Sequence, residues 1–207
     1  MIVGITGGVA TGKSEVLCLL KQHGAITFSA DEAARAVVSP NGHLLAEITR
    51  DFGPEVFEAN GSLNRAALGR RVFNDAGALK RLNALMHPAI WKLLRVQIEA
   101  AKVDMPAGST IVVEAPLLFE TNMANWFERI VVVTASESTQ ISRMLYRNGL
   151  DEPEARKRLR SQWPLVEKSR RADFVIVNDG SIGDLVDAVN NVWESLKLSV
   201  PNCARNW

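Results

Sequence analysis

The eight residues 7–14 constrain the fold of this chain more than any other segment. They read Gly-Gly-Val-Ala-Thr-Gly-Lys-Ser, which matches the spacing Gly-x-x-x-x-Gly-Lys-Ser of a Walker A phosphate loop. An apolar run at residues 2–6 precedes the loop, and residues 13–23 follow with leucines at helical spacing. This order of strand, loop and helix predicts a phosphate loop. The competing interpretation is a glycine-rich turn that only caps a helix.

The chemistry of phosphate binding explains each part of this motif. Glycines let backbone N–H groups turn toward the phosphates, and the following helix adds the positive end of its dipole. Lys13 is predicted to reach the β- and γ-phosphates of ATP, and Ser14 to coordinate Mg²⁺. The residues predicted to contact the nucleotide here are Gly8, Val9, Ala10, Thr11, Gly12, Lys13, Ser14 and Glu15.

Four further segments have the apolar, β-branched composition of buried strands. They are residues 25–29, 110–114, 129–134 and 173–177. Strands buried on both faces are typical of a parallel sheet covered by helices. We therefore predict an α/β fold, a three-layer P-loop NTPase sandwich around a five-stranded parallel sheet. A chain of 207 residues, 47% of them hydrophobic, is expected to form a single domain with insertions.

Two long helical regions interrupt the predicted sheet. We expect a core of residues 1–31, 108–135 and 172–198, a helical substrate-binding insertion at 32–107 and a helical lid at 136–171. His87-Pro88 predicts a boundary between two helices of the insertion, because a residue before proline disfavours the α conformation. The lid is predicted to break at Gly149, Pro153 and Pro164, the last helix to bury Leu185, Val189, Val192 and Leu196, and the tail from Ser199 to be loosely ordered.

Charge and cysteine content limit the partners and the location. Twenty-four Lys and Arg against 23 Asp and Glu leave a net charge of +1, which points to neither nucleic acid nor an anionic membrane. Cys18 and Cys203 form no metal-binding pair, and no apolar run is long enough to span a bilayer. We predict a cytoplasmic protein with a small-molecule substrate. The pattern specifies no oligomeric state.

Two carboxylates follow predicted strands, where an open parallel sheet binds its ligands. Asp31 follows the second strand and Glu114 ends the third, so both are expected near the γ-phosphate if these strands flank the first. Asp31 is a candidate base for an attacking hydroxyl, and Glu114 a candidate to hold Mg²⁺ through water. The alternatives stay open: Asp31 as the N-cap of a helix at residues 32–38, and Glu114 as a strand-end charge paired with a lysine or arginine.

Three basic side chains are further candidates. Arg143 and Arg147 lie four residues apart on one predicted helical face of the lid, where they are placed to neutralise a transferring phosphoryl group. A solvated helix face is the alternative explanation. His87 is a candidate ligand-binding residue or a structural histidine at a helix start.

The absence of two sequence motifs excludes a GTPase. The chain has no lysine after Asn or Thr and no aspartate with glycine three residues later, so it lacks the guanine and switch motifs of a GTPase. A phosphate loop with a helical insertion and an arginine-bearing lid suits a small-molecule kinase that closes over two substrates. The alternatives are another nucleotide or small-molecule kinase and a non-catalytic ATP-binding switch.

An ordered set of motifs resembles the dephospho-CoA kinase family over nearly the whole chain. The motifs are Thr6-Gly7-Gly8 with Gly12-Lys13-Ser14, Asp31 with Arg35, Leu82-Asn83 with His87-Pro88, Pro116-Leu117-Leu118-Phe119-Glu120, Gln140 with Arg143 and Arg147, Gln162 with Lys168, and Ala172-Asp173-Phe174-Val175-Ile176 with Asn178 and Gly180. The resemblance implies ATP-dependent phosphorylation of the ribose 3′-hydroxyl of dephospho-CoA, the last step of coenzyme A synthesis.

The resemblance also implies roles for individual residues. The resemblance implies that Asp31 is the general base. It also implies that Arg35 and His87-Pro88 form parts of the acceptor pocket in a CoA-binding insertion. Arg143 and Arg147 resemble lid arginines that contact nucleotide phosphates, and Asn178 is implied to lie near the adenine of ATP.

The sequence departs from the family pattern at two places. Ala10-Thr11 replaces the commoner Gly-Ser, and Glu114 stands where aspartate is frequent. Alanine at position 10 predicts an unstrained backbone there, and Thr11 keeps a hydroxyl.

Overall fold

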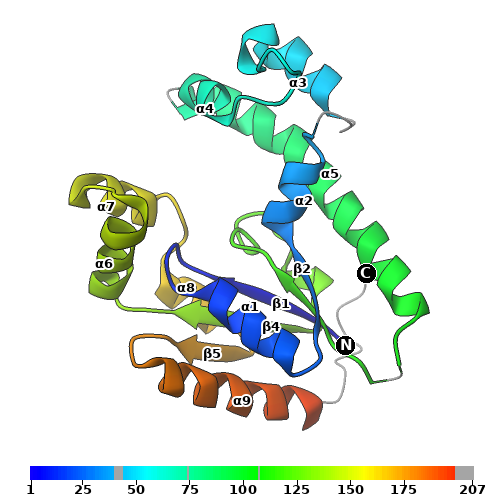
Figure 1. The fold of residues 1–207 in the computed structure, drawn as a ribbon, viewed down its shortest axis with the longest axis vertical. Coiled ribbons are helices and arrows are strands. Elements are labelled where there is room, and N and C mark those ends of the chain that lie inside the picture. Colours follow the sequence, from blue (N-terminus) through cyan, green and yellow to red (C-terminus); the bar gives the residue numbers. More distant parts are fainter. Residues whose placement is uncertain (40–43, 74, 107, 199–207) are drawn as a thin grey trace. The chain divides into compact units, whose positions relative to one another are not determined.

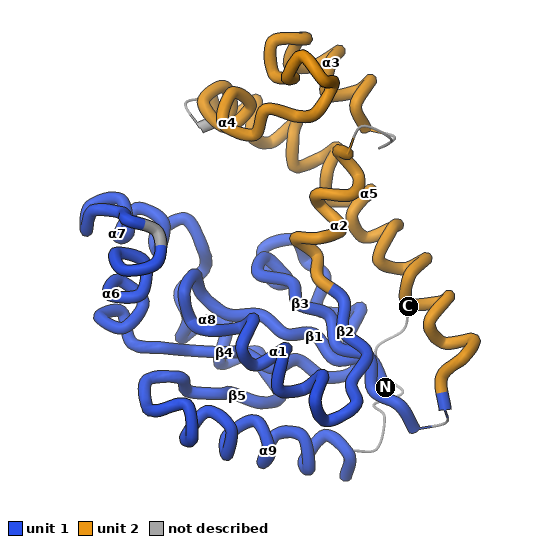
Figure 2. The backbone as a smooth tube through the Cα atoms, viewed as in Figure 1, with its two compact units in different colours: residues 1–28, 106–207 blue, residues 29–105 orange. Residues whose placement is uncertain are grey.

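The computed structural model describes residues 1–39, 44–73, 75–106 and 108–198 (Figure 1). The chain forms two compact units, one of residues Met1–Phe28 with Pro106–Trp207 and one of Ser29–Met105 (Figure 2). The predicted tail from Ser199 lies outside the described residues. None of the described helices is both long and apolar enough to cross a membrane.

The first unit is built on a parallel sheet of five strands, as predicted. The strands are β1 (Ile2–Gly7), β2 (Ile26–Ser29), β3 (Ile111–Glu114), β4 (Arg129–Thr134) and β5 (Phe174–Val177). Their order across the sheet is β2-β3-β1-β4-β5, so β1 lies centrally, between β3 and β4. The phosphate loop follows β1 directly and therefore starts at the middle of the sheet's carboxyl edge.

One face of this sheet packs against α1 (Lys13–Gln22) and α9 (Ile182–Leu198). Alternate strand residues such as Val3, Ile5 and Val133 are completely buried there with α1 and α9 side chains. The helix residues in this cluster are Val16, Leu20, Leu185, Val189, Val192, Trp193 and Leu196. This confirms the apolar face predicted for the last helix.

The opposite face is covered partly by the connection from β3 to β4, which includes the 3₁₀ helix Ala124–Trp126. A side chain on Gly4 would lie 2.7 Å from Leu118 and 2.8 Å from Phe127, so both residues press directly on the backbone of β1. Both are buried. Glycine at position 4 is required by this close packing.

Three helices connect β4 to β5. They are α6 (Glu137–Asn148), α7 (Glu152–Arg160) and α8 (Leu165–Arg170). Gly149 ends α6 in the left-handed conformation, Pro153 lies in the first turn of α7, and Pro164 is the N-cap of α8. These are positions where glycine and proline are favoured, so the predicted breaks are confirmed.

The second unit is helical. It contains α2 (Ala30–Ala36), α3 (Leu45–Phe52), the 3₁₀ helix Pro54–Val56, α4 (Arg65–Phe73) and α5 (Ala76–Val103). The buried residues Ile48, Phe52, Val56 and Leu68 form its core with Ala78 and Ala89 of α5. Each unit thus has a hydrophobic core of its own.

The predicted helix boundary at His87-Pro88 is wrong. The helix α5 continues through Pro88, which lies in its interior. Proline removes one N–H donor there, but packing offsets this cost. Residues on both sides of Pro88, including Leu82 and Leu85 before it and Ile90 and Leu93 after it, pack on the same cluster with α3 and α4. A break would disrupt that shared apolar face.

Candidate functional site

The loop between β1 and α1 is shaped around two glycines that no other residue can replace without strain. Gly12 has φ 90°, and a side chain on it would lie 2.1 Å from the Asn178 amide nitrogen. A side chain on Gly7 would lie 2.2 Å from the Val133 carbonyl oxygen. Gly12 is also the N-cap of α1, and no side chain caps this helix end. The first backbone N–H groups of α1 are therefore oriented for an external anion.

Ala10 corrects the expectation of an unstrained backbone. Its φ is 57°, in the left-handed region that residues other than glycine rarely adopt. For an L-residue this conformation costs roughly 1–2 kcal/mol. Such strain persists only where the surroundings hold the backbone in place.

Side chains from elsewhere in the unit do hold the loop backbone. Arg143 of α6 donates to the Ala10 carbonyl oxygen at 3.2 Å and to the Asn178 carbonyl oxygen at 3.0 Å. Buried Asn178, just after β5, donates its side-chain N–H to the Thr11 carbonyl oxygen at 2.8 Å. The two predicted residues therefore meet at the loop, where Arg143 also approaches Asn178 Oδ1 at 3.4 Å.

Lys13 and Thr11 act inside the loop. Lys13 Nζ donates to the Gly8 carbonyl oxygen at 2.7 Å, and Thr11 Oγ1 donates to the same atom at 3.0 Å. The Lys13 side chain is thus folded back along the loop, with its ammonium group at the Gly8 carbonyl oxygen. Ser14, in contrast, is exposed at the start of α1. A hydroxyl in this position is available to a cation bound beside phosphate.

Arg147 lies one helical turn beyond Arg143 and forms an ion pair with Glu15 at 3.0 Å. Arg143, Arg147, Glu15 and Asn178 border a cavity of about 190 Å³. Its other lining residues are Gly12, Gly180, Ile182 and Leu185. The structure brings together the two predicted lid arginines, the end of the loop between β1 and α1 and the loop after β5. Arg143 is half-buried there, whereas the Arg147 side chain is 57% exposed.

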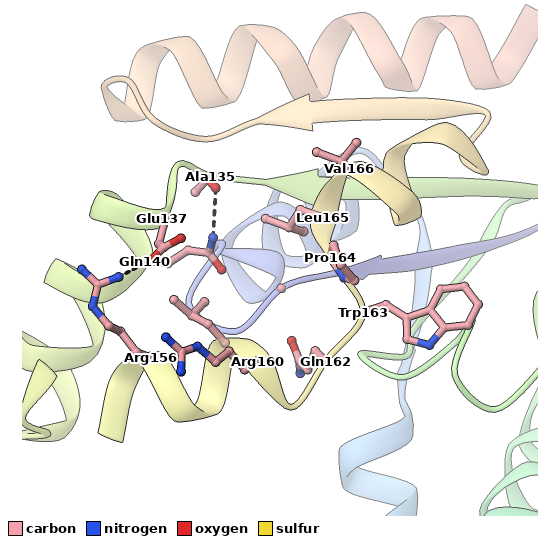
Figure 3. Close-up of a pocket in the computed structure, with 12 residues that line it drawn as sticks. Ala135, Glu137, Gln140, Arg156, Arg160, Gln162, Trp163, Pro164, Leu165 and Val166 are labelled. Carbon is pink, nitrogen blue, oxygen red and sulfur yellow. Dashed lines mark hydrogen bonds and ion pairs between the residues drawn. The ribbon is translucent and has the colours of Figure 1, made fainter. Parts of the chain in front are cut away.

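A larger cavity of about 660 Å³ is lined by Gly8 of the loop and by residues of helices α6, α7 and α8. Figure 3 shows Gln140 joined to the Ala135 carbonyl and Arg156 joined to Glu137 at its wall. The Gln140 Oε1 atom is buried without a hydrogen-bond partner among the described residues. Gln162 borders the same cavity and accepts the Val9 N–H at 3.0 Å.

A buried ion pair near the loop was not among the predicted site residues. Lys168 of α8 is fully buried and lies 2.8 Å from the Glu120 carboxylate. Lys168 also donates to the Pro116 carbonyl oxygen, which accepts the Thr6 hydroxyl at the end of β1. Glu120 and Lys168 occur among the family motifs, but neither has a sequence pattern that indicates burial. Only the contact between them reveals their role in the packing.

The predicted acceptor residues all belong to the second unit. Asp31 and Arg35 are exposed and lie four residues apart on α2, hence on one face of that helix. The N-cap interpretation of Asp31 is wrong: α2 begins at Ala30, and the Ser29 hydroxyl accepts the Glu32 N–H. Asp31 is a residue of the first turn, where a carboxylate is favoured by the helix dipole.

His87 and Pro88 lie in the interior of α5, with Pro88 exposed and His87 half-buried. The prediction that His87 lies at a helix start is therefore wrong. Partial burial lowers the pKa of the His87 imidazole, because desolvation disfavours its charged form. The His87 ring therefore favours its neutral form more than the ring of a solvent-exposed histidine does.

Glu114 ends β3 and is half-buried, opposite Ile5 of β1. Asp31 and Glu114 were predicted to lie near the γ-phosphate on the condition that the second and third strands both flank the first. The strand order meets this condition for one of the two strands only. The third strand does flank the first, but the second strand does not, because β2 lies beyond β3 and the other neighbour of β1 is β4. Glu114 is thus the predicted carboxylate whose strand pairs directly with the strand of the phosphate loop.

Comparison with known proteins adds to this geometry. A family model described as dephospho-CoA kinase matches residues 1–184. The chain is 41% identical over 181 residues to the dephospho-CoA kinase of Geobacillus kaustophilus, covering 87% of this chain and 89% of that protein. It is 42% identical over 189 residues to that of Syntrophotalea carbinolica, covering 91% and 89%. A solved dephospho-CoA kinase from Campylobacter jejuni is similar with a TM-score of 0.71 and 27% identity, over 95% of this chain and 97% of that one.

Proposed function

The chain belongs to the dephospho-CoA kinase family and is an enzyme that phosphorylates dephospho-CoA to coenzyme A; from this premise we propose which of its residues perform the transfer. ATP is the co-substrate that a kinase of this family uses. Another small-molecule kinase and a non-catalytic ATP-binding switch are not favoured by these matches.

We propose that residues 7–14 bind the ATP phosphates. The observation that carries this proposal is the preorganised loop, with its uncapped helix end and the Lys13 ammonium group among the backbone groups of the loop. Backbone N–H groups, a helix N-terminus and a lysine together stabilise phosphate charge. The proposed contacts are Gly8, Val9, Ala10, Thr11, Gly12, Lys13, Ser14 and Glu15, with Arg147 on the phosphates and Asn178 near the adenine.

We propose that Arg143 stabilises the charge of the transferring phosphoryl group. Its guanidinium already contacts the loop backbone at Ala10, next to the proposed phosphate site. Arginine provides a planar set of donors that fits phosphate oxygens. The region of residues 136–171 is accordingly proposed as a lid over the nucleotide, on the core of residues 1–31, 108–135 and 172–198.

The proposed metal is Mg²⁺, which supplies charge neutralisation between the phosphates of ATP when bound. No group of three or more His, Cys, Asp or Glu side chains in the described part of the chain is arranged to hold a metal ion. The donors that are present nevertheless fit Mg²⁺, since this ion is often held by one protein ligand together with substrate phosphates and water. The exposed Ser14 hydroxyl is the proposed protein ligand.

The acceptor half of the site is proposed for the segment 32–107 together with Asp31. In this scheme the Asp31 carboxylate takes the proton of the ribose 3′-hydroxyl, while the hydroxyl oxygen forms a bond to the γ-phosphorus and ADP leaves. Arg35, His87 and Pro88 are proposed to bind the acceptor.

We also propose a cytoplasmic location, because the exposed Cys18 thiol suits a reducing compartment.

The Asp31→Asn variant tests the proposed base. We expect kcat to fall by about 10²–10⁴-fold, the range that a general base contributes, with ADP binding unchanged. The assay is ADP release from ATP in the presence of dephospho-CoA, and mass spectrometry locates the added phosphoryl group on the product. Glu32→Gln, at the next exposed position of α2, is the matched control. Near wild-type turnover by Asp31→Asn would remove Asp31 from the mechanism.

A further inference from the structure

Three consecutive residues of the phosphate loop each have a backbone polar group bound by a side chain from another element. The Ala10 carbonyl accepts from Arg143, and the Thr11 carbonyl accepts from Asn178. The third group is the Val9 N–H, which donates to Oε1 of Gln162 at 3.0 Å. We infer that Gln162 is a positioning residue that holds the phosphate loop in its nucleotide-binding conformation. This inference rests on the proposal that the loop binds the ATP phosphates.

The strained residue of the loop lies within the held segment. Ala10 has a left-handed backbone, which an L-residue leaves whenever its neighbours allow. Rotation of the peptide between Val9 and Ala10, or of the one that follows it, would relieve the strain. The Ala10 carbonyl belongs to the peptide after Ala10, so its bond to Arg143 opposes rotation of that peptide directly. The Val9 N–H belongs to the peptide between Gly8 and Val9, so its bond to Gln162 fixes the backbone just before the Val9–Ala10 peptide and limits rotation of that peptide from its N-terminal side. Loss of either bond leaves the loop free to relax, so that its N–H groups no longer converge on a phosphate.

Gln162 is suited to this task because the linker that carries it is anchored. The next residue, Trp163, donates its backbone N–H to Glu120 at 3.0 Å. The Trp163 ring stacks on Phe119 with 6.3 Å between centroids, and the Arg171 guanidinium lies 4.7 Å from the centroid of the same ring. Glu120 is in turn fixed by the buried Lys168. Gln162 therefore contacts Val9 from a rigid support between α7 and α8.

A purely structural role would give a different result from a positioning role. If the Gln162 bond served only to satisfy the Val9 N–H, its loss would lower the stability of the whole first unit and affect both substrates equally. If the bond positions the loop, its loss weakens binding of the nucleotide and leaves the acceptor unaffected. Kinetics with both substrates separate the two cases.

The variant Gln162→Met removes the acceptor oxygen and keeps the length of the side chain. We expect the KM for ATP and the Kd for ADP to rise about tenfold, the effect of one net hydrogen bond. The kcat and the KM for dephospho-CoA are expected to stay within about twofold, because the loop binds ground state and transition state alike. Gln22→Met is the matched control, since Gln22 is exposed at the far end of α1.

A second substitution tests whether Gln162 acts through the strain at Ala10. Glycine adopts the left-handed conformation at no steric cost, so a loop with Ala10→Gly depends less on being held. In that background, Gln162→Met is expected to raise the Kd for ADP only about threefold, so that the two changes are coupled. An equal factor in both backgrounds would contradict the inference.

The remaining outcomes separate this inference from the function on which it rests. If wild-type protein does not bind ADP, or if Lys13→Met binds it normally, the phosphate-loop proposal fails. If wild type binds ADP and Gln162→Met behaves like Gln22→Met, only the positioning role fails. A parallel rise of both KM values together with a lower melting temperature would also overturn it, in favour of a structural role.

Discussion

Two single residues of the first unit have energetically costly features, one a strained backbone and the other a buried charge. Ala10 has a left-handed backbone, and the contacts of Arg143 and Gln162 hold the loop in this conformation. In α8, the side chain of Lys168 is fully buried together with its ammonium group. A buried charge is costly unless a partner compensates it. The strain at Ala10 is held by Arg143 and Gln162, and the buried charge of Lys168 is compensated by Glu120.

The buried ion pair leads to a prediction about stability. Lys168→Met leaves the Glu120 carboxylate, whose side chain is only 16% exposed, without its cationic partner. We expect the free energy of unfolding to fall by roughly 3–5 kcal/mol, as when one partner of a buried pair is removed. The double variant Lys168→Met with Glu120→Gln removes the uncompensated charge and is expected to recover part of this loss. Urea denaturation measures both.

The control is Lys197→Met, because Lys197 pairs with Glu194 on the exposed surface of α9. An exposed pair of this kind contributes at most about 1 kcal/mol. A double variant that is as unstable as Lys168→Met would show that the loss comes from packing of the lysine stem and not from the unpaired carboxylate.

At the scale of the elements, packing decides where helices begin and end. The helix α5 passes through Pro88 because its residues on both sides share one apolar cluster with α3 and α4. In contrast, α6 and α7 pack against each other in a cluster that contains Met144 and Ala155, and Gly149 and Pro153 lie at the turn that allows this packing. Pro164 is the N-cap of α8. The same residue types thus interrupt one helical region and not the other.

The position of His87 inside α5 predicts a pH dependence. Burial lowers its pKa in the folded protein below the unfolded value near 6.5. Between these two values the unfolded chain binds more protons than the folded chain, so stability is complete above about pH 6.5 and falls as the pH decreases through this window. We expect wild type to lose more stability than His87→Gln between about pH 7.5 and 5.5.

Urea denaturation at both pH values provides this comparison, and the other histidines cancel in the difference between the two proteins. His23→Gln is a control, since His23 lies outside α5 and bonds to Asn190 at 2.8 Å. An equal pH dependence for wild type and His87→Gln would mean that His87 is solvated in the folded protein.

On the scale of the whole molecule, the chain divides into two units with separate cores (Figure 2). The phosphate loop, Arg143, Arg147 and Asn178 belong to the first, and Asp31, Arg35, His87 and Pro88 belong to the second. The groups proposed for the nucleotide and for the acceptor are therefore supplied by different units. Binding of a nucleotide is expected to act on the first unit directly.

This division predicts how ADP affects thermal unfolding. At about 100 times its Kd, ADP is expected to raise the free energy of unfolding by about 2.7 kcal/mol through preferential binding to the folded state. The resulting rise in melting temperature should be lost in Lys13→Met and retained in Lys21→Met, which changes an exposed lysine at the other end of α1. Scanning calorimetry with and without ADP measures it. A full shift in Lys13→Met would show that ADP binds elsewhere.

The sequence by itself determined the parts of this protein that depend on neighbours along the chain. Apolar runs predicted all five strands, and the glycine and lysine spacing predicted the loop between β1 and α1. Gly149, Pro153 and Pro164 predicted the breaks between α6, α7 and α8. These features follow from local backbone preferences and from side-chain periodicity, and both can be recognised in a short segment of the sequence.

Only the tertiary structure decided the features that depend on residues distant in sequence. The helix α5 continues through Pro88, and Ala10 has a left-handed backbone. The contact of Gln162 with Val9 joins residues 153 positions apart, and Lys168 of α8 meets Glu120, which lies between β3 and β4. Each of these outcomes balances a local preference against packing or hydrogen bonds from elsewhere in the fold, and that balance is absent from any local pattern.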